Sequence, residues 1–294
     1  MSGPRPCPVC VPDLLKMKQR GEKIAMLTAY DFPTARQLDA AGADILLVGD
    51  SLGMVVLGYE STLPVTMDEM IHHTKAVVRG TQRALVVADM PYLSYHLSLR
   101  DSVRHAGRFV QEAGAKAVKV EGGRKRVRAI RAIRHAEIPV MGHVGLTPQS
   151  VHEFGGFKVQ GKSAAAARSI LEDALALEDA GVFSVVVEGI PAELAGMITE
   201  RLSVPTLGIG AGAACDGQVL VIHDLLGLTD GHVPSFVRKY AEVGATVREA
   251  CRHFVEDVRG GKFPSEVESS HLKEEVLEEV RGGLGPAAKR QWRS

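Results

Sequence analysis

Eight short runs of apolar and β-branched residues, separated by helix-length segments, limit the fold of this chain more than any other feature. Such runs predict buried strands, and the intervening segments have the apolar periodicity of helices. The predicted strands are Ile24–Tyr30, Ile45–Asp50, Ala84–Met90, Ala117–Glu121, Pro139–Val144, Phe183–Glu188, Pro205–Ile209 and Val219–Asp224. The predicted helices include Pro33–Ala41, Met67–Arg79, Leu99–Ala113, Arg124–Ala136, Ala164–Ala180 and Pro191–Arg201.

Strand–helix alternation of this kind predicts parallel strands joined by right-handed crossovers. Eight such units in a chain of 294 residues favour an α/β fold of the closed (β/α)8, or TIM, barrel type, which usually needs about 250 residues. An open doubly wound sheet is the main competitor. It normally carries a glycine-rich dinucleotide turn after its first strand, and no such turn follows Tyr30.

The two ends of the chain differ in character from this repeating part. We expect residues 1–22 to form an N-terminal arm or helix, and residues 23–262 to form one barrel domain that includes C-terminal helices within Pro234–Gly260. The charged tail over residues 263–294 contains Gly-Gly and Gly-Pro breaks and is expected to be partly disordered. Cys7 and Cys10 have metal-site spacing, but no second pair completes a zinc site, so we interpret them as incidental.

Composition excludes several classes of function. Hydrophobic residues make up 45% and charged residues 24% of the chain, as in an ordinary globular protein, and the formal net charge is +0. A neutral chain lacks the positive charge of a broad nucleic-acid or polybasic membrane surface. No apolar run is long enough to span a bilayer, and the first residues lack a secretory signal. We therefore expect a cytoplasmic protein that acts on small molecules.

Ionisable residues stand where predicted strands end, which is where barrel enzymes build their active sites. The residues concerned are Asp50, Asp89, Glu121, His143 and Glu188. Within the fourth strand, alternation places Lys119 on the same face as Glu121, and the valines between and before them on the other. An inward lysine and glutamate are costly to desolvate unless they are paired or used in chemistry.

Asp50, Asp89 and Glu121 end three consecutive predicted strands. Neighbouring strands are about 4.8 Å apart, so the three carboxylates can converge, and they would repel one another without a cation between them. Oxygen ligands favour a hard ion, with Mg²⁺ preferred. Glu121 lies farthest from Asp50 and binds such an ion either directly or through a water.

The other polar residues near the ends of the predicted strands have more than one interpretation. Glu188 lies across the barrel and is placed as a general base, or as a salt-bridge partner. Lys119 either supplies positive charge to a substrate or forms a Schiff base, and the carboxylate cluster favours the former. His143 either donates a hydrogen bond to substrate or is a core histidine. Ser51 is placed to hold a substrate oxygen.

Several ordered motifs closely resemble the ketopantoate hydroxymethyltransferase family over about residues 14–272. They are Met26–Asp31, Val48–Met54, Ser61–Thr66, Lys119–Gly123, Gly142–Ser150, Gly155–Gly161 and Gly208–Gly212. The resemblance implies transfer of a hydroxymethyl group from 5,10-methylenetetrahydrofolate to 3-methyl-2-oxobutanoate through an Mg²⁺-stabilised enolate. The product is 2-dehydropantoate, on the route to pantothenate, and the implied fold is similar to the phosphoenolpyruvate/pyruvate barrel superfamily.

The resemblance also implies residue roles. Asp50, Asp89 and Glu121 match the Mg²⁺ positions, and Glu188 matches the proton acceptor. Ser51 and Lys119, with the two aspartates, match the keto-acid contacts, and His143 is a further candidate. Family members form large rings, often decamers, so a homo-oligomer is implied. No local motif indicates which residues bind the folate.

Three rival functions remain open from the sequence. A metal-dependent lyase of the same superfamily would share the metal cluster but usually carries a catalytic cysteine on a mobile loop. A Schiff-base aldolase would use Lys119 covalently. A non-catalytic barrel that only binds a keto acid or folate is disfavoured by the four acidic strand tips.

Overall fold

A computed structural model of the chain describes residues 7–231 and 233–283. These residues fall into two compact units, one ending at Ala241 and the other beginning at Glu242, and each is described by itself. The expected domain boundary at residue 262 stays a prediction. Within the described ranges, every helix is too short or too polar to traverse a lipid bilayer.

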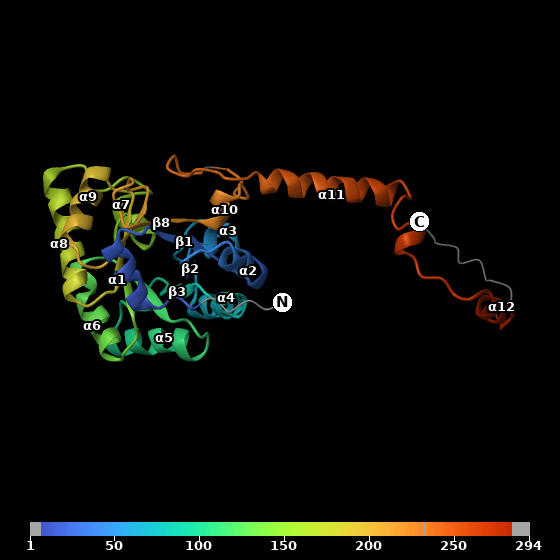
Figure 1. Cartoon of the computed structure of the whole chain (residues 1–294), viewed down its shortest axis with the longest axis horizontal. Coiled ribbons are helices and arrows are strands. Elements are labelled where there is room, and N and C mark those ends of the chain that lie inside the picture. The colour runs from blue at the N-terminus through green and yellow to red at the C-terminus, as the bar shows by residue number, and fades with distance from the viewer. Residues whose placement is uncertain (1–6, 232, 284–294) are drawn as a thin grey trace. The chain divides into compact units, whose positions relative to one another are not determined.

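The first unit is a closed barrel of eight parallel strands in sequential order, which confirms the predicted fold class and excludes the open sheet. Helices α4, α5, α6, α8 and α9 lie outside the strands (Figure 1). The strands are β1 Ile24–Thr28, β2 Ile45–Val48, β3 Leu85–Asp89, β4 Ala117–Glu121, β5 Val140–Gly145, β6 Ser184–Glu188, β7 Thr206–Ile209 and β8 Gly217–Leu220.

The six predicted helical segments are confirmed to within a few residues, because local signals set their starts. Asp31, Thr66 and Ser163 each accept a hydrogen bond from a backbone N–H in the first turn of the following helix. The helices of this unit are α1 Val11–Arg20, α2 Phe32–Ala40, α3 Leu52–Val55, α4 Met67–Gly80, α5 Leu99–Gln111, α6 Val127–His135, α7 Val151–Phe154, α8 Ala164–Asp179, α9 Ala192–Arg201 and α10 Ile222–Leu225, with 3-10 turns η1 Arg124–Arg126 and η2 Pro148–Ser150.

The position of the eighth strand differs from the prediction. β8 covers Gly217–Leu220 instead of Val219–Asp224, and Ile222–Leu225 is the short helix α10. The backbone N–H of Ile222 donates to Thr28 Oγ1 at 2.9 Å, which ends the strand beside β1. At the other end, a Cβ on Gly217 would lie 2.3 Å from the Ile24 carbonyl oxygen, so pairing with β1 requires glycine there.

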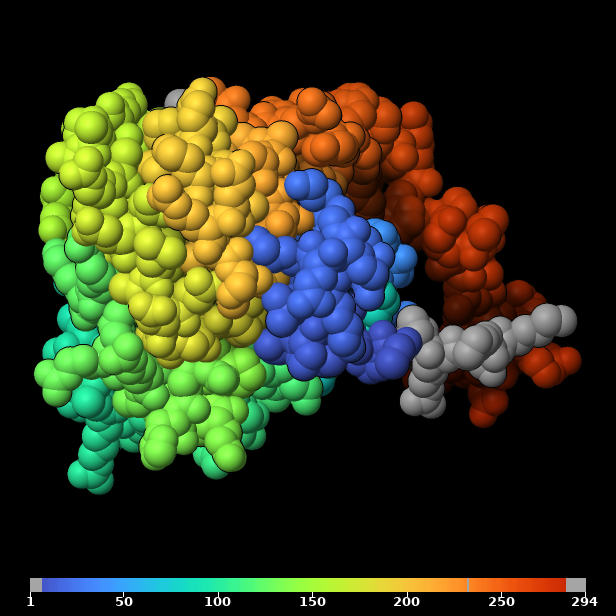
Figure 2. All heavy atoms as spheres, turned by 60° about the vertical axis from the view of Figure 1, so that its left-hand side comes forward, coloured from blue at the N-terminus to red at the C-terminus, as the bar shows by residue number. Residues whose placement is uncertain are grey.

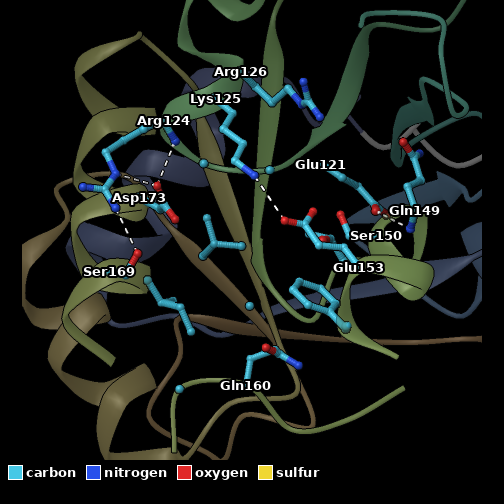
Figure 3. A pocket seen from close by; sticks show the side chains of 18 of the residues that line it. Glu121, Arg124, Lys125, Arg126, Gln149, Ser150, Glu153, Gln160, Ser169 and Asp173 are labelled. Atoms are coloured by element: carbon cyan, nitrogen blue, oxygen red, sulfur yellow. Dashed lines mark hydrogen bonds and ion pairs between the residues drawn. The ribbon is translucent and has the colours of Figure 1, made fainter. Parts of the chain in front are cut away.

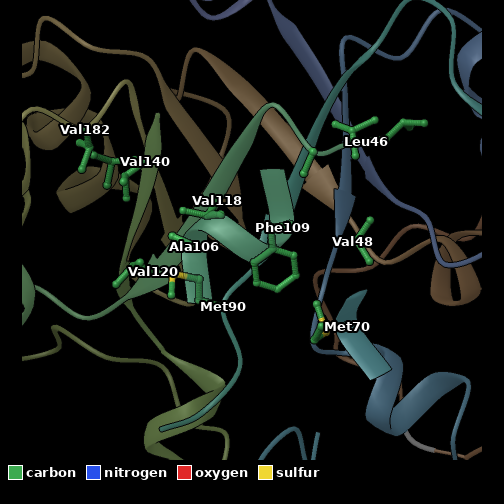
Figure 4. Packing of buried hydrophobic residues seen from close by; sticks show 14 of the residues in the cluster. Leu46, Val48, Met70, Met90, Ala106, Phe109, Val118, Val120, Val140 and Val182 are labelled. Atoms are coloured by element: carbon green, nitrogen blue, oxygen red, sulfur yellow. The ribbon is translucent and has the colours of Figure 1, made fainter. Parts of the chain in front are cut away.

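Alternation along the strands divides the core into two apolar layers. The outer layer packs strand residues such as Val118 and Val120 against helix residues such as Phe109, as Figure 4 shows. The inner layer fills the barrel with the opposite faces, including Ala117. Lys119, buried at 4% exposure, shares this inner face, which confirms the predicted direction of the two faces of β4.

Helix α1 closes the amino-terminal end of the barrel. Leu14 is fully buried in the inner apolar layer, and Lys18 Nζ donates to Asp216 Oδ2 at 2.8 Å and to the Thr199 carbonyl at 3.0 Å. Figure 2 shows α1 in blue beside the yellow and orange residues of this region. Cys7 and Cys10 are exposed, and Cys10 Sγ lies 2.8 Å from Asp13 Oδ2, an interaction within the start of the helix.

The second unit contains α11 Val243–Arg259, the 3-10 turn η3 Glu266–Glu268 and α12 Glu274–Gly283. The helical prediction over Pro234–Gly260 is wrong before Val243, since residues 234–242 contain a turn and otherwise have no regular secondary structure. In this stretch the Tyr240 N–H donates to the Leu225 carbonyl at 2.8 Å instead of to a helical partner. The part of the predicted tail beyond residue 283 lies outside the described residues.

Candidate active site

A pocket of about 100 Å³ lies at the carboxyl ends of the strands. Every site residue predicted from the sequence lines it: Asp50, Ser51, Asp89, Lys119, Glu121, His143 and Glu188. They come from the turn that follows β2 and from β3, β4, β5 and β6, so residues far apart in the sequence meet through barrel closure. We call this the inner pocket.

The strand register places the charged side chains in neighbouring pairs. Asp89 of β3 is paired with Lys119 of β4, and Glu121 of β4 is paired with His143 of β5. Glu188 of β6 stands opposite Gly145 of β5, two residues beyond His143. Paired residues on adjacent strands point to the same side of the sheet, so Asp89 faces Lys119 and Glu121 faces His143.

The result is a row of alternating charge along the wall of the inner pocket. Lys119 Nζ lies 2.6 Å from Asp89 Oδ1 and 3.5 Å from Glu121 Oε1. His143 continues the row, with Nδ1 3.4 Å from Glu121 Oε1 and Nε2 3.3 Å from Glu188 Oε2. Each cation therefore lies between two carboxylates, and the first four side chains are 2–4% exposed.

Burial and these neighbours set the protonation of the group. Burial opposes the charged form of Glu121, but Lys119 and His143 outweigh it and lower the pKa of Glu121 to about 2. Burial and Lys119 also oppose protonation of His143, yet the nearby carboxylates of Glu121 and Glu188 raise its pKa to about 9. The two carboxylates therefore favour the charged form of His143.

Among the carboxylates of the inner pocket, Asp50 has the least positive charge nearby to offset its own negative charge. Burial, followed by repulsion from Asp89 and Glu121, raises its pKa well above the ordinary value, and Lys119 only partly offsets this. Its own N–H donates to Asp89 Oδ2 at 3.1 Å, which fixes the two aspartates side by side. Next to it, Ser51 Oγ is 2.9 Å from Tyr30 Oη, so the serine is held at the rim.

Glu188 lies on the opposite wall. In a closed ring of eight strands in order, β6 is diametrically across from β2, so Glu188 faces the Asp50 side of the pocket. Its side chain is 16% exposed, against 2% for the neighbouring His143. Glu188 is therefore the most accessible of the acidic groups in the row.

Two site residues had no role in the sequence interpretation. The Gln149 side-chain amide donates to Asp50 Oδ2 at 2.8 Å, and its backbone N–H donates to Glu121 Oε2 at 3.0 Å. Tyr95 Oη donates to Gln149 Oε1 at 2.5 Å. Gln149 belongs to the Gly142–Ser150 motif, so the motif was a usable signal, whereas no local pattern distinguishes Tyr95.

The chemistry of the donors fits a hard cation. Within residues 7–231 and 233–283, no three His, Cys, Asp or Glu side chains are grouped so as to hold a metal by themselves, because Lys119 Nζ stands between Asp89 and Glu121. Mg²⁺ typically needs only one or two carboxylates, with water and substrate oxygens completing its shell. Asp50 and Asp89 are adjacent and buried, and Asp50 has no cationic side chain within ion-pair distance among the described residues, which meets that need.

Comparison with known proteins identifies the family. A model of the ketopantoate hydroxymethyltransferase family matches residues 8–266, which is most of the chain. The chain belongs to the ketopantoate hydroxymethyltransferase family. The resemblance drawn from the motifs is thereby confirmed.

Relatives of this chain in the ketopantoate hydroxymethyltransferase family carry one name. The 3-methyl-2-oxobutanoate hydroxymethyltransferase of Syntrophomonas wolfei is 57% identical over 272 residues, covering 92% of this chain and 99% of the relative. The enzyme of the same name from Syntrophus aciditrophicus is 59% identical over 250 residues, covering 85% of this chain and 92% of the relative.

Solved structures show where the fold of this family member belongs. Phosphonopyruvate hydrolase, solved in complex with oxalate and Mg²⁺, matches with a TM-score of 0.57 at 12% identity, over 92% of this chain and 94% of that one. A 2,3-dimethylmalate lyase of the PEP mutase/isocitrate lyase superfamily matches with a TM-score of 0.55 at 14% identity, over 93% and 99%. At such identities the likeness concerns the fold alone, and it agrees with the closed barrel seen in this chain.

Proposed function

We propose that this chain transfers a hydroxymethyl group from 5,10-methylenetetrahydrofolate to 3-methyl-2-oxobutanoate, giving 2-dehydropantoate. One observation carries the proposal: a small pocket holds an accessible carboxylate, Glu188, across from the buried pair Asp50 and Asp89. A base and an electrophilic site on opposite walls are what removal of a proton next to a carbonyl needs. The name shared by relatives at 54–59% identity supports the substrates.

Asp50, Asp89 and Glu121 would hold Mg²⁺, with Asp50 and Asp89 as the direct ligands best supported by the contacts. When bound, the ion would act as a Lewis acid toward the carbonyl oxygen of the keto acid. The solved phosphonopyruvate hydrolase, which holds Mg²⁺ and oxalate, supports this assignment by analogy of fold.

Glu188 removes the proton from C3 of the keto acid in the proposed reaction. Lys119, fixed 2.6 Å from Asp89, supplies positive charge to the oxygen of the resulting enolate. Ser51 at the rim donates to the substrate carboxylate, and His143 holds Glu188 in place. The enolate carbon then bonds to the folate methylene carbon as the bond from that carbon to one folate nitrogen breaks, and this nitrogen takes up the proton that Glu188 removed. Water then replaces the second nitrogen on the same carbon and gives it a proton, so that the hydroxymethyl product and tetrahydrofolate are released.

The rival functions are less well supported by the site. No cysteine lines the inner pocket within the described residues, although a superfamily lyase usually carries a catalytic one. A Schiff base would require Lys119 to be neutral, whereas Asp89 and Glu121 favour its charged form and raise its pKa despite burial. Both observations favour the transferase.

An assay with 3-methyl-2-oxobutanoate and 5,10-methylenetetrahydrofolate, with and without Mg²⁺, tests the proposal. We expect formation of 2-dehydropantoate that stops on chelation and returns when Mg²⁺ is added. Chelator-resistant activity together with trapping of substrate on Lys119 by borohydride would establish the Schiff-base aldolase instead.

We also infer that the chain assembles as a homo-oligomer, with a decamer as the expected ring. The support is a stripe of exposed residues on α11, at positions i, i+4, i+7 and i+11 of the helix: Val247, Cys251, Phe254 and Val258. Apolar residues at this spacing form one face of a helix that normally packs against a partner.

A further inference from the structure

A second, larger cavity adjoins the inner pocket and is used by none of the steps above. It has a volume of about 370 Å³, and we call it the outer cavity. Residues after β4 and β5 and the first half of α8 line it, and Figure 3 shows Arg124, Lys125 and Arg126 along one side. Glu121 borders both spaces, so the outer cavity begins at the wall of the inner pocket.

The outer cavity also reaches the chain next to the proposed base. Gly145, which lines it, is the β-sheet partner of Glu188, and the N–H of Leu146 donates to the Glu188 carbonyl at 2.8 Å. A ligand in the outer cavity would therefore lie beside the part of the barrel where the new carbon–carbon bond forms.

Most charges lining the outer cavity compensate one another. Arg124 Nε lies 2.9 Å from Asp173 Oδ1, and its Nη1 lies 2.6 Å from a Glu172 oxygen. Lys125 Nζ lies 3.3 Å from Glu153 Oε1, an ion pair drawn in Figure 3. Arg126 differs, because it has no carboxylate within ion-pair distance among the described residues.

The Arg126 side chain is held in place although its charge is uncompensated. It packs against Gly122, where a Cβ would come within 3.0 Å of Arg126 Cγ, and its guanidinium lies 5.7 Å from the centre of the Tyr95 ring. Its Nε is buried without a hydrogen-bond partner, as is Nδ1 of His96, which also lines the cavity. Buried polar atoms are normally satisfied, so these two point to a polar ligand, and the charge of Arg126 favours an anionic one.

The volumes of the two cavities indicate which substrate each one can hold. The inner pocket, at about 100 Å³, suits a small keto acid but not a folate. Cavities that bind larger organic ligands occupy about 300–1,000 Å³, and the outer cavity falls in that range. Aromatic rings of Tyr95 and Phe154 in its lining suit the flat ring systems of a folate, and Arg126 suits its carboxylates.

We propose that the outer cavity binds the folate co-substrate, and that Arg126 pairs with a carboxylate of its glutamate portion. The proposal rests on the proposed function, because it assumes that a folate is the second substrate. Beyond the proposed function, the proposal names residues that recognise the folate. It also places the methylene group of the folate on the side of Glu121 that faces the outer cavity.

The decisive variant is Arg126→Gln in the full chain. Loss of one charge-assisted hydrogen bond in a binding site predicts about a tenfold to hundredfold rise in the Kd of tetrahydrofolate and in KM for 5,10-methylenetetrahydrofolate. Calorimetry with tetrahydrofolate alone measures the former. Arg128→Gln, an exposed arginine on α6 outside the cavity lining, is the matched control and is expected to change neither constant.

The primary amide of tetrahydropteroic acid, a folate analogue that lacks the glutamate and carries no carboxylate, tests which part of the ligand Arg126 contacts. Wild-type protein should bind it more weakly than tetrahydrofolate, and Arg126→Gln should bind both equally. Phe154→Ala, which removes a ring from the lining, should weaken binding of both ligands. An Arg126→Gln protein that binds tetrahydrofolate as tightly as wild type, with Phe154→Ala also unchanged, would overturn the proposal.

Exchange of the keto acid's C3 proton with solvent needs no folate and separates the two proposals. If wild-type protein exchanges the proton, and if its folate binding is unaffected by Arg126→Gln and Phe154→Ala, only the proposed folate site is contradicted. If wild-type protein neither exchanges the proton nor forms 2-dehydropantoate in the presence of the folate, the proposed function itself is contradicted.

Discussion

Glu188 is the residue on which the proposed chemistry depends most directly. Glu188→Ala is expected to abolish measurable exchange of the C3 proton of 3-methyl-2-oxobutanoate, because a general base contributes about 10²–10⁴-fold to such a step. Proton NMR in deuterated buffer follows the exchange. Glu193→Ala, an exposed glutamate on α9, is the control, and exchange that persists in Glu188→Ala would exclude Glu188 as the base.

His96 gives a prediction about stability and pH. Burial, with a contribution from Arg126, lowers its pKa from 6.5 to about 4. The unfolded chain therefore binds a proton at a higher pH than the folded chain, so stability is lost as pH falls from about 6.5 to about 4. His96→Gln should abolish this pH dependence. Between pH 7 and pH 5 the free energy of unfolding of the variant should therefore fall less than that of wild type, by on the order of 1 kcal/mol.

Denaturant unfolding at the two pH values measures the difference between His96→Gln and wild type. The comparison cancels the carboxylates that titrate in both proteins. An equal loss of stability in the two proteins would show that His96 titrates normally in the folded chain.

Sequence alone could point to the seven residues that line the inner pocket, because each lies on the inner face of a strand or close to the end of one. It could not show that Lys119 stands between Asp89 and Glu121, since that depends on the register of three strands. Arg126 was hidden for a related reason. In the sequence it is one of three consecutive basic residues, and only the contacts reveal that the other two are paired.

At the scale of elements, Gly217 is where sequence and structure disagree most usefully. Glycine is disfavoured in strands, so the strand was predicted to start at Val219. The barrel needs glycine there because the strands approach too closely for a side chain: a Cβ would lie 2.6 Å from Leu207 Cδ2 as well as 2.3 Å from the Ile24 oxygen. The propensities of individual residues do not reveal how closely two strands pack, so this requirement for glycine could not be predicted from the sequence.

Gly217→Ala should therefore destabilise the barrel by about 2–3 kcal/mol, through overpacking between β1 and β8. Gly107→Ala on α5 is the matched control, because its Cβ would meet nothing within 4 Å, and it should stabilise by about 0.5–1 kcal/mol. Chemical denaturation measures both. Equal stability of the two variants would mean that β8 can shift away from β1 without cost.

At the scale of the whole molecule, the proposed homo-oligomer would be held by the exposed apolar stripe on α11. A single charged substitution there, Phe254→Asp, should lower the molar mass in solution, because it places a carboxylate in an apolar contact. Light scattering after size exclusion measures the mass. Ala245→Asp, exposed on the opposite side of the same helix, should leave it unchanged, and a wild-type monomer would contradict the inferred homo-oligomer.

The alternating row Asp89, Lys119, Glu121, His143 and Glu188 also restricts how such a site can evolve. Removing one buried partner of an ion pair costs about 3–5 kcal/mol, and each interior member of the row has two partners. A change at one position therefore leaves its neighbours with unmatched charge. Viable descendants of this sequence would have to exchange charges in concert on adjacent strands, or keep all five residues as they are.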